Sequence, residues 1–196
     1  MKKVNLLIAP AAAAAFFATD AFATGDVIEV DITGFQSFGA QGSALNSVVS
    51  LNLGAGAVVT GIGWGLTLQS GGTIGDGASW QNEATFAFTD VLGAATGVTV
   101  TPAAGTTFST PGTGAFSSGG ILKLADAGIP DIALADGILE IEFFETFDDP
   151  FGDSGATQDA EILQGTLFIQ VLIPAPAGLA LLGAAGFAGR GRRRRG

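Results

Sequence analysis

The chain has no cysteine, no histidine and no tyrosine among its 196 residues. Without cysteine it forms no disulfides. Without cysteine and histidine it lacks the side chains for Ser-His-Asp or Cys-His catalysis and for typical structural zinc sites. The stability of the fold must therefore come from packing and hydrogen bonds, with or without bound ions.

Positive charge is almost missing from the middle of the chain. Residues 24–173 contain 17 carboxylates and a single cation, Lys123, which gives this stretch a net charge of −16. Such a field repels phosphate groups, so nucleic acid is excluded as a partner. Lys123 stands between Leu122 and Leu124, and we expect it to be a solvated lysine at a strand end.

The other cations lie at the two ends, and two of them are lysines directly after Met1. Residues 4–18 are almost wholly apolar, but a permanent transmembrane helix needs a longer run of about 20. Ala21 and Ala23 then fit the small-x-small pattern of signal-peptidase cleavage. We predict that residues 1–23 form the helix of a signal peptide that signal peptidase removes after Ala23. The alternative is a buried N-terminal helix of a cytosolic domain.

The last segment, residues 174–196, contains a Pro-x-Pro motif, a small-residue apolar stretch over 177–189, and a basic stop. The motif is Pro174, Ala175 and Pro176, and the basic stop consists of Arg190, Arg192, Arg193, Arg194 and Arg195. A helix over the apolar stretch reaches only about 20 Å, against a hydrocarbon core near 30 Å. The arginines favour the cytoplasmic face. We therefore predict a short transmembrane helix that acts as a processing signal.

This three-part tail resembles the PEP-CTERM sorting domain, which is also catalogued under the label "ice-binding protein C-terminal domain". Ala175 replaces the glutamate of the Pro-Glu-Pro pattern, and Ile173 precedes the motif where related variants carry valine. The resemblance implies an exosortase-type processing enzyme as a partner. It also implies an inner-membrane anchor during sorting, followed by release to the cell surface or extracellular matrix. The alternative is an ordinary C-terminal tail anchor with basic flanks.

The body, residues 24–173, is long enough for one domain with a sizeable core. Apolar residues alternate with polar or small ones in several stretches, which is typical of β-strands. The predicted strands cover residues 27–33, 61–68, 84–89, 138–144 and 167–173, with weaker candidates at 47–53, 97–101 and 120–124. Glycine-rich turns separate them. We predict an all-β fold, a single antiparallel β-sandwich of the jelly-roll type.

A second resemblance supports this architecture. Residues 136–145, which read Asp-Gly-Ile-Leu-Glu-Ile-Glu-Phe-Phe-Glu, and residues 165–169, which read Gly-Thr-Leu-Phe-Ile, are similar to the closing strands of P-domain-like jelly rolls of secreted proteins. Comparable bodies precede sorting tails in other exported bacterial proteins.

Acidic residues concentrate late in the body. Eight carboxylates occur within 22 residues, namely Glu140, Glu142, Glu145, Asp148, Asp149, Asp153, Asp159 and Glu161. Proline and glycine make residues 147–155 a loop, and oxygen ligands crowded on a loop suit Ca²⁺. The candidate calcium ligands are Asp148, Asp149 and Asp153. The alternative is a solvated acidic surface, where screening makes the repulsion tolerable.

Two further hypotheses concern sugars. Glu140 and Glu142 share one side of a strand and suit the acid and base of a glycoside hydrolase, although acidic pairs also protect edge strands from aggregation. Trp80 lies outside the strand patterns and is the candidate carbohydrate contact. Trp64 follows the core alternation, and Phe35 and Phe38 complete the possible aromatic platform.

Taken together, the sequence predicts a non-enzymatic exported protein that serves as a structural or adhesive β-sandwich at the cell surface or in the extracellular matrix. A carbohydrate-binding module for exopolysaccharide is the first alternative, and a glycoside hydrolase is the second.

Overall fold

The computed structural model describes residues 25–71, 79–90, 97–105, 111–147 and 158–173. One compact unit covers residues 25–173, and the two terminal segments make up a second unit that lies outside the described residues. The predicted signal helix over 1–23 and the predicted sorting helix over 177–189 both fall there. Within the described ranges, no helix has the length and apolarity needed to cross a membrane.

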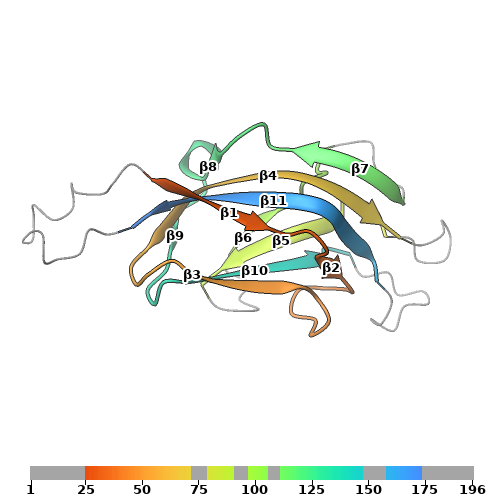
Figure 1. The fold of residues 1–196 in the computed structure, drawn as a ribbon, viewed down its shortest axis with the longest axis horizontal. Helices are drawn as coiled ribbons and strands as arrows, with labels where there is room; N and C mark the ends of the chain where they lie inside the picture. The colour runs from red at the N-terminus through yellow and green to blue at the C-terminus, as the bar shows by residue number, and fades with distance from the viewer. Residues whose placement is uncertain (1–24, 72–78, 91–96, 106–110, 148–157, 174–196) are drawn as a thin grey trace, which may run out of the picture. The chain divides into compact units, whose positions relative to one another are not determined.

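The described unit consists of two antiparallel sheets (Figure 1). The larger sheet contains β1 (Asp26–Asp31), β2 (Gln36–Ser37), β4 (Val58–Ser70), β7 (Gly112–Ser117), β8 (Leu122–Lys123), β9 (Ile132–Ala133) and β11 (Ala160–Leu172). The smaller sheet contains β3 (Val48–Asn52), β5 (Ala84–Thr89), β6 (Val98–Val100) and β10 (Ile138–Glu145). A single 3-10 turn, Ala125–Ala127, is the helical element of the described chain.

The strand order is that of a jelly roll. The larger sheet runs β1-β11-β4-β7, with β2 also on β11 and with β8 and β9 also on β4. The smaller sheet runs β3-β10-β5-β6. When the two-residue strand β2 is left out and β7, β8 and β9 are taken as one position, the two sheets follow the orders 1-8-3-6 and 2-7-4-5, so that most connections cross between sheets. The predicted all-β antiparallel sandwich is confirmed.

The pairing of β4 with β11 runs along the length of the larger sheet and contains two irregularities. The register shifts at Thr60 on β4 and at Leu163 on β11. A bulge inserts one unpaired residue and so reverses which side chains face inward. For this reason Ile162 and Leu167 are both buried although they lie five residues apart on one strand.

The core lies between the two sheets and is built from the apolar faces of the predicted strands. Phe86 of β5 and Phe143 of β10 stack with ring centroids 4.8 Å apart, and Phe88 is also fully buried. Offset aromatic pairs of this kind add stability beyond their buried area. The larger sheet contributes branched side chains such as Ile62 and Ile169.

Three local expectations differ from the structure. The sequence analysis missed β7, because Gly112–Ser117 contains two glycines and no apolar alternation. The strand expected over 120–124 shrinks to the two residues of β8. Ile173, expected to continue the last strand, lies beyond β11 and is exposed.

Candidate functional site

One end of the sandwich has a polar interior. Ser70, the last residue of β4, pairs with Ala160, the first residue of β11, and Ala160 also pairs with Ser37 of β2. These three side chains are buried and share the inward face with Leu68 and Ile162. Figure 1 shows β2 and the end of β4 at this end of the sandwich, with β8 and β9 at the other. We call the group Ser37, Ser70, Ser79, Glu145 and Asp159 the polar end.

Two acidic residues from different sheets meet at the polar end. The Ser79 hydroxyl lies 3.3 Å from Oε2 of Glu145 and 3.3 Å from Oδ1 of Asp159. Glu145 is the last residue of β10, and Asp159 directly precedes β11. The main chain fixes the arrangement, because the Glu145 amide donates to the Gly39 carbonyl and the Asp159 amide donates to the Ser37 carbonyl. Ser79 therefore bridges the two sheets.

The burial of acidic residues corrects one expectation. The alternative of a solvated acidic surface is wrong for Glu142, Glu145 and Asp159, which are 2%, 3% and 8% exposed. Other chain segments cover them: the loop over 38–46 lies over Glu142, and Ser79 contacts Glu145 and Asp159. The predicted calcium ligands Asp148, Asp149 and Asp153 lie outside the described residues.

Glu142 holds a loop in place. Its Oε1 accepts hydrogen bonds from the Gly42 amide at 2.6 Å and from Nδ2 of Asn46 at 2.9 Å. Asn46 also accepts a hydrogen bond from the Phe38 amide and donates to the Ala40 carbonyl. Bonds to a buried carboxylate are stronger than bonds between neutral groups. The carboxylate of β10 thus fixes the loop over residues 38–46.

The two glutamates of the hydrolase hypothesis have different surroundings. Glu140 is partly exposed, and both of its carboxylate oxygens accept from the Ser50 hydroxyl at 2.7 Å. Glu142 is covered by the loop that it anchors. A general acid and base must both reach a substrate. In this structure the carboxylate of Glu142 is buried and hydrogen-bonded to Gly42 and Asn46, so it does not face a substrate.

Trp80 is exposed on the surface beside the polar end, with 41% of its area accessible. Its amide donates to Oε2 of Glu83, and the Glu83 amide donates to the Trp80 carbonyl. The Thr146 amide and hydroxyl both donate to the Glu83 carbonyl. The next residue, Phe147, is 57% exposed. Two exposed aromatic residues therefore flank one hydrogen-bonded turn. Phe147 was not among the aromatic candidates predicted from the sequence. The one local indication of its exposure is that two acidic residues directly follow it.

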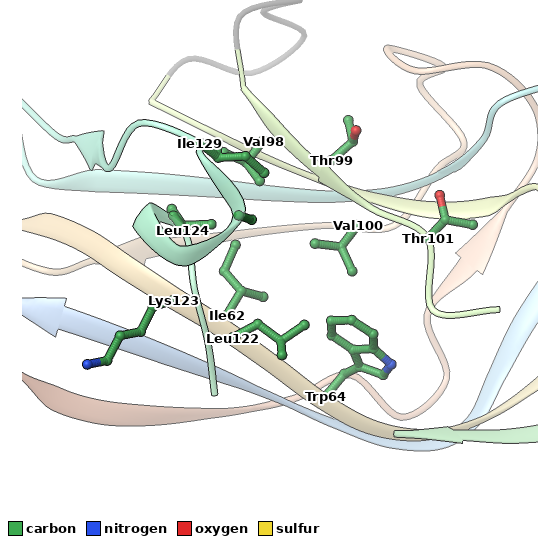
Figure 2. A pocket seen from close by; sticks show the side chains of 11 residues that line it. Ile62, Trp64, Val98, Thr99, Val100, Thr101, Leu122, Lys123, Leu124 and Ile129 are labelled. Carbon is green, nitrogen blue, oxygen red and sulfur yellow. The ribbon is translucent and has the colours of Figure 1, made fainter. Parts of the chain in front are cut away.

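The remaining aromatic candidates do not join Trp80 on an open surface. Trp64 and Phe35 pack against the core, and Phe38 is partly buried. Trp64 lines a cavity of about 210 Å³ between β4 and β6 (Figure 2), and its buried Nε1 has no hydrogen-bond partner. Lys123 borders the same cavity on exposed strand β8, and its amine points away from it. Its expected role as a solvated strand-end lysine is confirmed.

The predicted residues of the two termini are outside the described part of the chain. This applies to the cleavage-site residues Ala21 and Ala23, to the motif Pro174, Ala175 and Pro176, and to the basic stop Arg190, Arg192, Arg193, Arg194 and Arg195. They remain sequence-based predictions.

No protein-family model and no curated protein matches the chain. Among solved structures, it is similar to one described as the structure of infectious bursal disease virus Gt strain, with 18% identity and a TM-score of 0.36. A second similar structure is the infectious bursal disease virus VP2 subviral particle, with 18% identity and a TM-score of 0.33. Each match covers 79% of this chain and 33% or 34% of the other, so the chain spans about a third of their length.

The loop-anchoring role of Glu142 is testable with Glu142→Gln. Both donors, on Gly42 and Asn46, bond to Oε1, so the glutamine oxygen can still accept from them, but without the negative charge that strengthens the bonds. The new NH2 group takes the place of Oε2, which is buried without a hydrogen-bond partner, and so becomes an unsatisfied buried donor. We expect a loss of about 1–3 kcal/mol in the free energy of unfolding, measured by urea denaturation at neutral pH. Glu140→Gln is the matched control on the same strand and should cost less than about 0.5 kcal/mol. Equal stability of the two variants would contradict the role.

Proposed function

We propose that this chain is an exported structural or adhesive β-sandwich, sorted through its C-terminal tail by an exosortase-type system to the cell surface or extracellular matrix. The observation that carries the proposal is the order of Pro-x-Pro motif, apolar stretch and arginine cluster over residues 174–196. A signal peptide over 1–23 supplies the matching entry to the export pathway. In this proposal the inner membrane and the two processing enzymes are transient partners.

The charge distribution supports the same proposal. The described body contains one cation, Lys123, whereas the other seven lysines and arginines occupy the two ends of the chain. Positive charges near apolar segments set the orientation of those segments during membrane insertion. The large negative net charge of the body, which has so few cations, also favours solubility.

A second candidate function, a carbohydrate-binding module for exopolysaccharide, is favoured by the exposure of Trp80 and Phe147 on either side of the Glu83 turn. Flat aromatic rings provide large apolar contact area at little conformational cost, and sugar rings have apolar faces that suit such contacts. The glycoside hydrolase alternative is not carried forward, because Glu142 is engaged with Gly42 and Asn46.

Replacing the four consecutive arginines, Arg192 to Arg195, with serine tests the sorting proposal. With only Arg190 of the basic stop left, we expect the protein to be lost from the cell-surface fraction and to accumulate unprocessed or in the medium. Intact mass and cell fractionation provide the measurement. Lys123→Ser is the control, since it removes a cation from the body and should leave sorting unchanged. Normal surface delivery of the arginine variant would contradict the proposal.

Trp80→Ala tests the carbohydrate-binding candidate. Loss of an aromatic anchor at a binding surface typically costs more than 1 kcal/mol, so affinity for exopolysaccharide from the producing cells should fall about tenfold. Binding is measured by affinity electrophoresis or a pull-down. Leu163→Ala is the matched control, because Leu163 is also 41% exposed but lies on β11. An equal effect of both substitutions would argue against a specific sugar contact.

A further inference from the structure

The space between the two sheets has an opening beside β6, the edge strand of the smaller sheet. Across from β6, the edge of the larger sheet is divided, because β8 and β9 each pair with only two residues of β4. The cavity of about 210 Å³ that Trp64 borders lies here, and a second cavity of about 280 Å³ adjoins it. Val98 and Ile129 line both cavities. We call the two cavities together the side groove.

The first cavity is apolar. Ile62 and Trp64 of β4 form one wall, and Val100 of β6 lies opposite them (Figure 2). Leu122 is 49% exposed and Ile129 is 37% exposed, so two large apolar side chains border the groove without full cover from the described chain. Because an apolar cavity of about 150 Å³ is large enough for benzene, the first cavity has room for an apolar group of about six carbons.

The second cavity is acidic. Asp90, which follows β5, and Asp131, which precedes β9, both line it and are both exposed. Lys123, the one cation among the described residues, lines the first cavity, but its amine points away from it (Figure 2). The charges that face the groove therefore lie in one cavity, and both are negative. This combination complements a ligand that carries an apolar group and a positive charge.

We propose that the side groove binds a small organic cation, an ammonium group attached to an alkyl chain or ring of about six carbons. The apolar group fills the first cavity, and the ammonium group lies beside Asp90 and Asp131 in the second. A neutral alcohol of the same length makes the apolar contact alone. An anion is disfavoured by the two carboxylates and by the net charge of −16 of residues 24–173.

This inference goes beyond the proposed function and does not depend on it. Trp80 lines neither cavity, so the side groove and the candidate carbohydrate surface are separate sites. The residues of the groove all belong to the body of the chain, so variants of the groove leave the two terminal sorting signals intact.

The test is a binding titration of the full chain with hexylammonium, hexanol and hexanoate, which share a chain length and differ in charge. In a Trp80→Phe background Trp64 is the only tryptophan, and its fluorescence reports on the first cavity. We expect hexylammonium to bind about threefold to tenfold more tightly than hexanol, because ion pairs with exposed carboxylates are modest in strength. Hexanoate should bind most weakly.

Substitutions separate the two halves of the groove. Asp90→Asn and Asp131→Asn should each bring the affinity for hexylammonium toward that for hexanol and leave the hexanol affinity unchanged. Leu122→Ala should weaken both ligands, since it removes apolar contact from the first cavity. Asp26→Asn is the matched control, because Asp26 is an exposed carboxylate on β1 that lines neither cavity, and it should change neither affinity. All four side chains are exposed, so the substitutions should not disturb folding.

Four outcomes would overturn the proposal. The first is no binding of hexylammonium, or equal affinities for hexylammonium and hexanol. The second is binding that is unchanged in Asp90→Asn, Asp131→Asn and Leu122→Ala, which would place the ligand elsewhere. The third is binding of a short peptide with an apolar residue and a lysine where hexylammonium does not bind, which would indicate a peptide partner. The fourth is a dimer in sedimentation that Leu122→Ala dissociates, which would mean that a second copy covers the groove. None of these results bears on sorting or on the Trp80 test.

Discussion

The pairing of β4 with β11 is the constraint on which the rest of the structure depends. In the larger sheet, β1 and β2 attach to β11, while β7, β8 and β9 attach to β4. The two bulges, at Thr60 and Leu163, decide which side chains enter the core at each end. The polar end takes its position from the same ladder, because Ser70 and Ala160 are partners at its limit. The same pairing positions the surface around Trp80, because the Ser79 amide donates to the carbonyl of Gly71, the residue after β4.

The surplus of carboxylates is used in two ways within this frame. Glu142 fixes the loop over 38–46, because its carboxylate accepts hydrogen bonds from the Gly42 amide and the Asn46 side chain. Glu145 and Asp159 come from different sheets and meet at the Ser79 hydroxyl. A protein without cysteine cannot join distant segments by disulfides. Hydrogen bonds to buried carboxylates join such segments here.

Much of the fold follows from local sequence, and most of the site does not. The alternations around Ile62, Phe86, Ile141 and Ile169 predict strands correctly, because period-two patterns record one buried face. The bulge at Leu163 has no local signal, since it exists only relative to β4. The burial of Glu142 depends on Asn46, 96 residues away in sequence. The exposure of Trp80 could be predicted, because it lies outside the strand patterns. The meeting of Glu145 with Asp159 could not be predicted without knowing the order of the strands in the two sheets.

The most direct test of this account is amide hydrogen exchange followed by NMR on the folded chain. If the β4–β11 ladder organises the molecule, the slowest-exchanging amides should lie on its paired interior, from Ile62 to Leu68 and from Gly165 to Gln170. The edge strands β3 and β6 of the smaller sheet should exchange faster. Fast exchange along β4 and β11, or greatest protection in β3 and β6, would contradict the central place given to this pairing.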